Sequence, residues 1–352
     1  MPREQEPEHS DTWEVFEHEN TTSSQSLSAC FDEMFNVSLQ NHAGNPIWHF
    51  GTRQMLSLIV FTVVILAVAG SAPWLIRRAY RTPRCAISDT PASLKLPYQN
   101  CRIPTANGKY LSAWFIADND SKDKLPVVAI MHGWGGCAAQ MLPFARLLHQ
   151  AGYGVLLLDA RNHGGSDSDS FSSMPRFAED LENGLNWLKE QPRTDPCRLF
   201  LLGHSVGAAA TLLLASQRQD LAGVISIPGF AHPGELMRRQ MQSRHIPYHP
   251  FGWLILRYIE RTIGFSFDDI APCNTIRHIE CPVMLIHGRA DNFIPMEDSK
   301  TIYANRAGDN VQLILLEGVG HNSIAALSRH AETLLRFMSH CSQQNQDDQH
   351  WL

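Results

Sequence analysis

The sequence of 352 residues places one serine in a setting that suits nucleophilic chemistry. Residues 203–207 read Gly-His-Ser-Val-Gly, directly after the apolar run 199–202 and before the Ala- and Leu-rich run 208–215. The order strand, tight turn, helix projects the Ser205 hydroxyl from a sharp turn, where a weak nucleophile can reach both a base and a substrate. The two glycines leave room where β-carbons would collide with the neighbouring strand and helix. The pattern predicts that Ser205 is a catalytic nucleophile; the alternative is a Gly-rich turn around an unreactive serine.

A serine nucleophile requires a base, and position along the chain selects among seventeen histidines. His321 lies in the segment 318–322, Gly-Val-Gly-His-Asn, after the last expected strand and before the last expected helix. This loop lies at the carboxyl edge of the expected sheet, where the imidazole can reach Ser205. His204 is excluded because neighbouring residues on the turn point apart. We predict His321 as the general base, against the alternative of a surface histidine, and expect three further histidines to brace loops: His132, His163 and His287.

The base in turn requires an orienting acid. Asp291 follows the expected strand 283–287, one strand before His321, in the chain order Ser, Asp, His. A carboxylate there would hold the imidazole tautomer and stabilise the imidazolium formed during attack. Asp159 ends a different strand and is expected to form a structural pair with Arg161. The other rival carboxylates lie late in an insertion: Asp268 and Asp269.

Two backbone N–H groups are candidates for an oxyanion hole. Val206 follows the nucleophile at the N-terminus of the expected helix, so its N–H points to where an oxyanion forms. Residues 132–136 read His-Gly-Trp-Gly-Gly after an early strand, and glycines let the backbone approach a reacting carbonyl closely. We predict the N–H of Trp134 as the second donor, with Gly133 as the fallback, and the Trp134 side chain as a wall of the pocket. Packing alone is the alternative explanation of this turn.

These motifs follow strands in a repeating pattern. Asn107-Gly108 predicts a hairpin turn between the first two strands. The later alternation of strands and helices predicts a mostly parallel, eight-stranded sheet with helices on both faces. The expected strands are 99–103, 110–116, 127–131, 154–159, 199–202, 221–227, 283–287 and 311–316, and the expected helices include 138–151, 175–190 and 322–338.

Residues 230–270 break this rhythm and predict a helical cap over the nucleophile. They combine methionine, aromatic and arginine side chains, and Gly252–Ile263 would form a helix with an apolar and a basic face. One interpretation is a hydrophobic acyl or lipid pocket. The alternative is ordinary packing of helices onto the domain, because Met and aromatic stripes usually belong to cores.

The N-terminal region differs from the rest in charge. Residues 1–50 hold nine Asp and Glu but only Arg3 as a basic residue, which predicts an acidic, disordered tail over 1–54. Segment 55–76 is uncharged over 22 residues, and a bilayer core needs about 20. We predict a single transmembrane helix there; a signal peptide fits badly because the preceding segment is long and acidic. Arginines cluster after the segment, which favours a cytoplasmic location for the rest of the chain.

Composition excludes several classes. Beyond the acidic tail the chain is slightly basic, and no nucleic-acid-binding pattern is present. The eight cysteines form no C-x-x-C and no zinc spacing, so we expect no metal and no organic cofactor. They neither require nor exclude disulfides, and the oligomeric state is left open.

From about Leu96 to Met338 the chain resembles the α/β-hydrolase superfamily, in particular the cap-bearing serine esterases, lipases and S33-type peptidases. Five motifs in the expected order carry the resemblance: 132–136, 159–166, 203–207, 288–291 and 320–321. It implies an α/β-hydrolase fold, a triad of Ser205, Asp291 and His321, and oxyanion donors at Trp134 and Val206. The serine at the nucleophile position argues against the branches that use an aspartate. Substrate does not carry over, because one scaffold hosts many chemistries.

The sequence therefore predicts a membrane-anchored serine hydrolase that cleaves esters or thioesters of an acyl or lipid-like substrate. An aminopeptidase or amidase of the same fold is one alternative, and a non-enzymatic membrane scaffold is another. The expected organisation is a tail (1–54), a transmembrane helix (55–76), a juxtamembrane linker (77–95), the hydrolase domain (96–340) with a cap at about 230–270, and a C-terminal tail (341–352).

Overall fold

The computed structural model describes residues 39–40, 46–47, 51–118, 124–324 and 330–349. The chain divides into two compact units, residues 1–72 and residues 73–352. In the first, the two-residue strands β1 (Leu39–Gln40) and β2 (Pro46–Ile47) pair antiparallel. The predicted acidic tail lies mostly outside the described residues.

Helix α2 (Thr52–Ala79) includes the segment predicted to cross a membrane. Its side chains at 65, 68, 69, 72, 77 and 79 lie outside the described residues. Among the residues that are described, no helix combines enough length and apolarity to cross a bilayer. The structure therefore does not support the predicted transmembrane helix.

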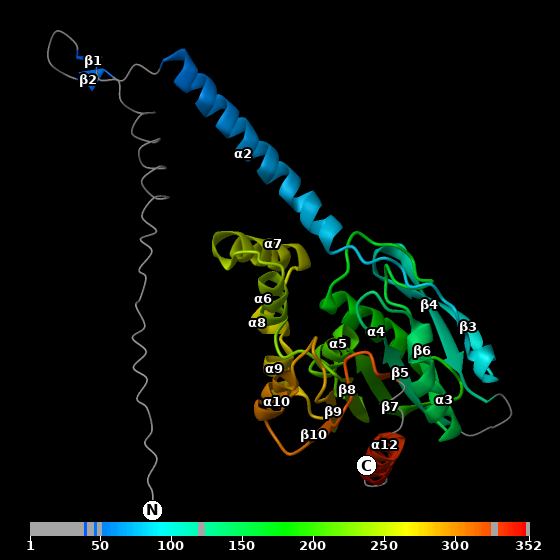
Figure 1. The fold of residues 1–352 in the computed structure, drawn as a ribbon. Helices are drawn as coiled ribbons and strands as arrows, with labels where there is room; N and C mark the ends of the chain where they lie inside the picture. Colours follow the sequence, from blue (N-terminus) through cyan, green and yellow to red (C-terminus); the bar gives the residue numbers. More distant parts are fainter. Residues whose placement is uncertain (1–38, 41–45, 48–50, 119–123, 325–329, 350–352) are drawn as a thin grey trace, which may run out of the picture. The chain divides into compact units, whose positions relative to one another are not determined.

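An eight-stranded sheet organises the second unit (Figure 1), in the order β10-β9-β8-β7-β5-β6-β4-β3. All neighbours pair parallel except β3 with β4 and β4 with β6, which pair antiparallel. The predicted mostly parallel sheet of eight strands is confirmed. The strands are β3 (Gln99–Thr105), β4 (Lys109–Ile116), β5 (Leu125–Met131), β6 (Gly154–Leu158), β7 (Thr194–His204), β8 (Gly223–Ile227), β9 (Val283–Gly288) and β10 (Val311–Leu316).

The hairpin between β3 and β4 forms at the predicted turn. Asn107 and Gly108 have φ of 60° and 64°, and Thr105 pairs with Lys109. Two adjacent positive φ values suit the twist of a tight hairpin, which explains the Asn-Gly pair. Strand β3 alternates buried and exposed residues, as an edge strand does, whereas β6, β8 and β9 are buried throughout.

Helices cover both faces of the sheet. On one face α4 (Met174–Lys189) and α5 (Val206–Ala215) pack on alternate side chains of β5, such as Ala129 and Met131. On the other face α3 (Leu142–Gln150) and α12 (Ala331–Gln349) pack on the intervening side chains, such as Val128 and Ile130. Successive side chains of a strand point to opposite faces of the sheet, so the buried strands contribute to one apolar layer on each face.

Two predicted helices differ in extent. The run 138–151 begins as a 3-10 turn, Ala138–Met141, and becomes α-helical only at Leu142, because Pro143 suits a first turn and not a helix interior. Helix α12 continues to Gln349 and buries Cys341, so the part of the predicted C-terminal tail before residue 350 is helical. Residues 325–329, within the expected last helix, lie outside the described residues.

The cap lies between β8 and β9. It consists of α6 (Pro233–Ser243), a π-helical turn (Tyr248–Gly252), α7 (Trp253–Ile263), α8 (Phe267–Ile270) and α9 (Pro272–Thr275). Arg239 on α6 forms two hydrogen bonds, of 2.9 and 2.6 Å, with the buried carboxylate of Asp298 on α10 (Met296–Ala304). This ion pair ties the cap to the sheet domain.

The segment predicted as a linker, 77–95, packs on the hydrolase domain. Arg84 donates hydrogen bonds to the carbonyl oxygen of Gly164 (2.6 Å) and to Ser168 Oγ (2.9 Å). Thr82 Oγ1 lies 3.4 Å from His163 Nε2, and Pro91 is buried. The prediction of a juxtamembrane linker rested on the position of this stretch and on its two prolines; polar contacts hold it on the domain.

Candidate active site

Ser205 occupies the sharp turn between β7 and α5. Its backbone has φ 57° and ψ −116°. This conformation is unfavourable for any residue that carries a side chain. Its N–H donates to the carbonyl oxygen of Ile227 at 2.8 Å, which holds the turn. A β-carbon on Gly203 would lie 2.2 Å from the Gly207 carbonyl oxygen, and one on Gly207 would lie 2.5 Å from that of Met131. A side chain at either glycine of the motif would therefore clash with the backbone.

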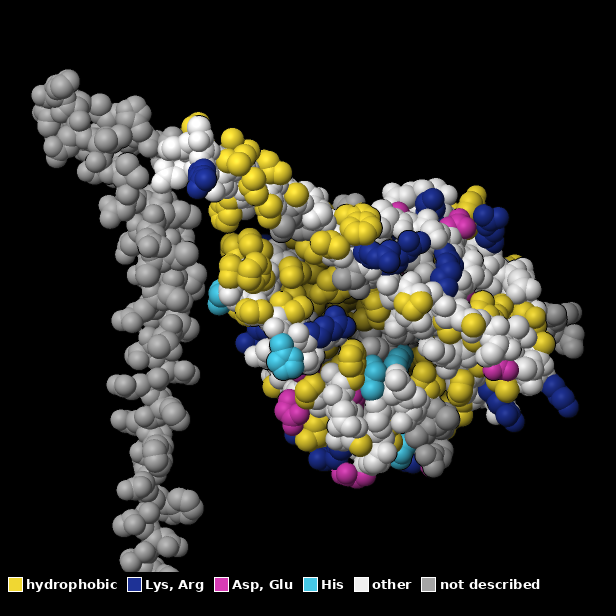
Figure 2. All heavy atoms as spheres, turned by 45° about the horizontal axis from the view of Figure 1, so that its top comes forward, with side chains coloured by type: hydrophobic (Ala, Val, Ile, Leu, Met, Phe, Trp, Pro, Cys, Tyr) yellow, Lys and Arg dark blue, Asp and Glu magenta, His cyan; other side chains and the backbone are white. Residues whose placement is uncertain are grey.

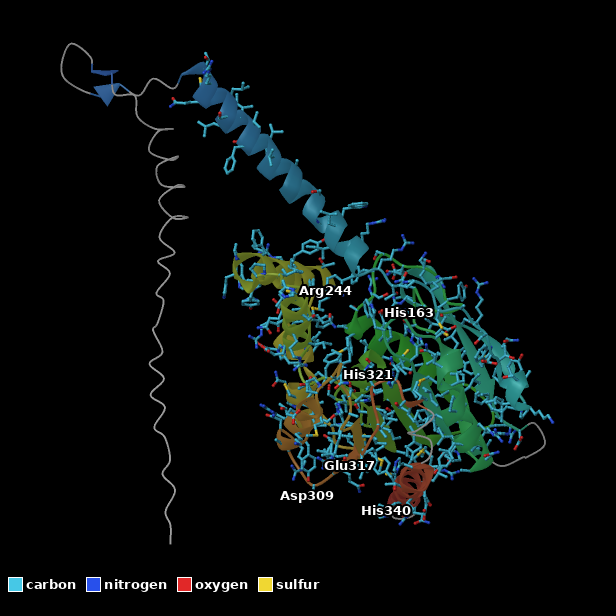
Figure 3. All side chains as sticks on the ribbon, in the orientation of Figure 1. His163, Arg244, Asp309, Glu317, His321 and His340 are labelled. Atoms are coloured by element: carbon cyan, nitrogen blue, oxygen red, sulfur yellow. The ribbon has the colours of Figure 1, made fainter. Side chains whose placement is uncertain are left out.

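The structure brings Ser205, His321 and Asp291 together, although 116 residues separate the first two. His321 Nε2 lies 3.2 Å from Ser205 Oγ, and His321 Nδ1 lies 2.8 Å from Asp291 Oδ2. Figure 3 shows His321 between the cap and the strands of the sheet. These distances form an uninterrupted chain of hydrogen-bonding atoms from carboxylate to hydroxyl.

The Asp291 carboxylate is fully buried but well partnered. Its Oδ1 accepts hydrogen bonds from the N–H groups of Phe293 (2.9 Å) and Ile294 (2.8 Å). Burial by itself would raise the pKa of Asp291, but the hydrogen bond from His321 and those two backbone donors outweigh it, so the pKa is lowered. The ionised carboxylate accepts a hydrogen bond from the protonated Nδ1 of His321, which leaves Nε2 as an acceptor facing Ser205.

The predicted oxyanion donors lie beside the nucleophile. Val206 is the first residue of α5, so its N–H has no partner within the helix. A β-carbon on Gly133 would lie 3.1 Å from Ser205 Cβ, which places this loop against the nucleophile. The N–H of Trp134 donates to no protein acceptor in the described part of the chain. Trp134, Ser205 and Val206 line one pocket, and the Trp134 indole stacks on Phe177 at 6.2 Å between centroids.

Three other histidines brace loops, as expected. His132 Nδ1 bonds the Gly133 carbonyl oxygen at 2.7 Å, and its Nε2 accepts from the N–H of Ala160. His163 Nδ1 lies 3.0 Å from the Arg161 carbonyl oxygen. His287 lies between Ser299 Oγ and the Ile294 carbonyl oxygen. Burial lowers the pKa of His132 and of His163 to about 4 and also lowers that of His287, so all three rings are neutral near pH 7.

The expected pair of Asp159 and Arg161 is wrong. Asp159 instead accepts hydrogen bonds from the N–H groups of Ala138 (2.7 Å) and Gly165 (2.8 Å). Arg161 turns away to α4, where its Nε donates to Asp180 at 2.7 Å and its Nη2 bonds Glu179. The two side chains leave the same strand end in opposite directions, which sequence proximity alone does not show.

His204 has a contact that sequence analysis missed. It is buried, and its Nε2 donates to the His321 carbonyl oxygen at 2.9 Å. Burial lowers its pKa to about 4, so it is neutral. Among the described residues, His321 and not His204 hydrogen-bonds the Ser205 hydroxyl, and His204 holds the loop that carries His321. No local pattern signals a contact across 117 residues.

A pocket of about 780 Å³ opens over Ser205. Its cap side is apolar, with Leu236, Met237, Ile259 and Phe267 among the lining residues. Within the described ranges, no three His, Cys, Asp or Glu side chains are grouped so that they could hold a metal ion. The arrangement therefore suits acyl transfer to a serine in an apolar site.

Solved structures of known proteins share this architecture. An esterase of Pyrococcus furiosus superposes with a TM-score of 0.60 at 24% identity, over 74% of this chain and 97% of that one. An acylaminoacyl peptidase superposes with a TM-score of 0.55 at 18% identity, over 69% of this chain and 41% of that one. The chain has an α/β-hydrolase fold.

Sequence comparisons agree with this α/β-hydrolase fold. The family described as serine aminopeptidase, S33, matches residues 122–255. A Mycobacterium tuberculosis protein described as uncharacterized is 27% identical over 77% of this chain and 90% of its own length. A lysophosphatidylserine lipase of Danio rerio is 26% identical over 51% of this chain and 46% of its own length.

Proposed function

We propose that the protein is a serine hydrolase that cleaves carboxylic esters or thioesters through an acyl-enzyme. The observation that carries the proposal is the Ser205–His321–Asp291 chain of hydrogen-bonding atoms beneath an apolar pocket. No residue in this mechanism requires a metal or an organic cofactor.

Acylation begins at Ser205. As its Oγ attacks the acyl carbon, His321 Nε2 takes the hydroxyl proton, and the Asp291 carboxylate stabilises the imidazolium through Nδ1. The N–H groups of Val206 and Trp134 stabilise the carbonyl oxygen as it becomes negatively charged. Collapse of the tetrahedral intermediate transfers the proton from Nε2 to the leaving alcohol or thiol.

Deacylation reverses the roles. Water attacks the acyl carbon of the Ser205 ester while His321 Nε2 accepts one of its protons. Cleavage of the ester bond returns that proton to Ser205 Oγ and releases a carboxylic acid. The overall reaction consumes one water and yields an acid with an alcohol or a thiol.

Pocket chemistry and relatives both favour an acyl substrate. The apolar cap wall suits a hydrocarbon chain, because burial of each methylene contributes about 0.8 kcal/mol. An esterase and a lipase are among the similar proteins. The finer assignment, to esters or thioesters of lipid-like acids, is our proposal.

The peptidase alternative is supported by the match to the serine aminopeptidase family, S33. A free substrate N-terminus would require an unpaired carboxylate in the pocket. Glu235 pairs with Arg238 and Glu260 pairs with Arg257, and neither glutamate lines the pocket. The pocket therefore favours ester substrates over N-terminal amines.

The test is labelling with a fluorophosphonate probe, which reacts with activated serines. We expect the wild type to be labelled, Ser205→Ala and His321→Ala to remain unlabelled, and Ser243→Ala, on the exposed end of α6, to be labelled like the wild type. Hydrolysis of p-nitrophenyl esters of increasing chain length then measures the acyl preference. A folded wild type without labelling and without hydrolysis of esters, thioesters or aminoacyl amides would support the scaffold alternative instead.

We also propose the membrane as a partner of the chain. Large apolar side chains of α2 are exposed, including Leu56, Phe61 and Leu66 at 62–65%, and exposed apolar surface of this extent marks interaction sites. Fractionation with carbonate extraction tests the association, and protease protection tests the predicted cytoplasmic side. Full recovery in the soluble fraction without detergent would refute both.

A further inference from the structure

Three arginines lie on one side of the pocket that contains Ser205. Arg78, Arg81 and Arg84 are exposed, and all three line this pocket. They belong to the stretch that was expected to be a linker and that instead packs on the hydrolase domain. Their position brings three positive charges to the cavity that holds the nucleophile.

Within the residues that the structure describes, none of these arginines forms an ion pair, although the charge of Arg84 acts on the buried Asp159 carboxylate and tends to lower its pKa. Arg84 donates only to neutral acceptors, the carbonyl oxygens of His163 and Gly164 and the Ser168 hydroxyl. The Arg78 guanidinium lies 5.7 Å from the centroid of the Trp74 ring. Guanidinium groups that line a pocket without an ion-pair partner attract anions.

Among the described residues that line the pocket, Asp169 is the only acidic one, and its carboxylate is already engaged. The Asp169 side chain is 8% exposed and bonds Asn107, Arg161 and Arg176. These contacts lower the pKa of Asp169 despite its burial, so its charge is balanced by its own partners. Its ion pairs are with Arg161 and Arg176 and not with the three arginines.

Serine hydroxyl groups line the pocket together with the arginines. Ser168, Ser170 and Ser172 line the pocket beside the arginines. Ser168 Oγ accepts a hydrogen bond from Arg84, so its own hydrogen remains available to a ligand. Arginine and serine donors together form the usual environment of a phosphate or a carboxylate.

The cap contributes mainly apolar side chains to the same pocket, with Leu236, Met237, Ile259, Ile263 and Phe267 among them. In Figure 2, hydrophobic side chains gather around a hollow of the globular unit, and Lys and Arg side chains lie at its edge. A cavity with one apolar and one cationic side fits a molecule that has an apolar and an anionic end.

We propose that the substrate is an acyl ester whose alcohol portion carries a negative charge, a phosphate or a carboxylate. The acyl chain packs on the cap wall, the ester carbonyl lies at Ser205, and Arg81 and Arg84 bind the anion. Hydrolysis consumes water and releases a carboxylic acid and an anionic alcohol. This inference rests on the proposed serine hydrolase activity.

A matched pair of substrates isolates the anion. A monoacylglycerol and the corresponding monoacylglycerol phosphate share the acyl chain and the ester bond and differ only in the phosphate. We expect the wild type to hydrolyse the phosphate with a kcat/KM about 10- to 100-fold higher, the range for one or two charged hydrogen bonds. Raising the ionic strength should reduce this preference, because salt screens exposed charges. An acyl glycolate, with a carboxylate in place of the phosphate, identifies which anion is preferred.

Variants locate the preference on the arginines. The exposed Arg81 side chain forms no hydrogen bond or ion pair with the described part of the chain, so Arg81→Gln should fold like the wild type. We expect Arg81→Gln and Arg84→Gln each to lower the ratio of kcat/KM for the phosphate ester to kcat/KM for the neutral ester about tenfold. The ratio is the readout because Arg84 also holds residues 77–95 on the domain. Arg84→Lys should recover part of the loss, and Arg146→Gln, on the exposed face of α3 outside the pocket, should have no effect.

The outcomes separate this inference from the proposed function. Equal rates on the two esters, or an equal loss on both in Arg81→Gln, would overturn the anion site while leaving the hydrolase intact. Fluorophosphonate labelling without hydrolysis of either ester would also overturn it. Failure of labelling together with failure of hydrolysis would refute the proposed function itself.

Discussion

Asp291→Asn tests the central part of the proposed mechanism, because the structure determines how the amide must orient. Oδ1 accepts two backbone hydrogen bonds, from Phe293 (2.9 Å) and Ile294 (2.8 Å). Only the carbonyl oxygen of asparagine can accept both, so its NH₂ group must occupy the position of Oδ2, 2.8 Å from His321 Nδ1. His321 must then carry its proton on Nε2, where it faces Ser205 as a donor and cannot accept the hydroxyl proton.

The expected loss is large. The variant presents the wrong tautomer to Ser205 and also lacks the charge that stabilises the imidazolium. A substitution of this kind lowers kcat by about 10⁴-fold, equivalent to about 5 kcal/mol in the activation barrier. Residual activity should persist, because Val206 and Trp134 still offer their N–H groups to the oxyanion.

The assay is kcat for a short p-nitrophenyl ester, with urea denaturation measured in parallel. Asp291→Ala is the matched control: it should lose similar activity but more stability, because it leaves two backbone N–H groups without an acceptor, at about 1–3 kcal/mol each. The folded-state pKa of Asp291 lies below its ordinary value of 3.8. Its charge therefore stabilises the fold above that value, and the stabilisation is lost as the pH falls through the folded-state pKa, a dependence that Asp291→Asn should lack. Retention of more than a tenth of wild-type kcat by Asp291→Asn would refute the orienting role of this carboxylate.

Three further predictions concern the elements that position the site. Gly203→Ala places a β-carbon 2.2 Å from the Gly207 carbonyl oxygen, so we expect a loss of about 3 kcal/mol or more in thermal denaturation, against little change in Gly308→Ala. Asp298→Ala removes the partner of Arg239, whose side chain is 35% exposed. We expect the free energy of unfolding to fall by about 1–2 kcal/mol and proteolysis within residues 230–270 to become faster. An unchanged cleavage rate would contradict the anchoring role of this ion pair. Each of three buried histidines has a folded-state pKa of about 4 against 6.5 in the unfolded chain, so unfolding takes up protons between those values. The three residues are His132, His163 and His204. The free energy of unfolding should therefore fall with decreasing pH by about 1.4 kcal/mol per pH unit for each histidine. A free energy of unfolding that stays constant from pH 6 to 4.5 would exclude these lowered pKa values.

Sequence reasoning succeeded where the signal is local. Alternation and apolar runs predicted the strands because a strand has a side-chain period of two, whether one face or both are buried. Asn107-Gly108 predicted its hairpin because both residues adopt positive φ. The motif around Ser205 predicted the turn between β7 and α5, because only glycine fits at two of its positions.

Contacts between distant segments were not predictable in the same way. Nothing around residue 84 indicates that its guanidinium will bond Gly164, and nothing around His204 indicates that its ring will bond the His321 carbonyl. Arg161 and Asp159 are two residues apart but have different partners. Such contacts depend on which loops the packed sheet brings together.

The sequence by itself determined the order of strands and helices, the strained turn at Ser205 and the chemical types available for catalysis. Each of these depends on backbone conformation or side-chain volume within a few residues. Only the tertiary structure decided that His321 and Asp291 lie within hydrogen-bonding distance of one another and of Ser205. It also decided that three arginines of an expected linker share a pocket with the nucleophile. The physical reason is that the parallel sheet brings the ends of distant strands to one edge, and side-chain packing across that edge sets the distances.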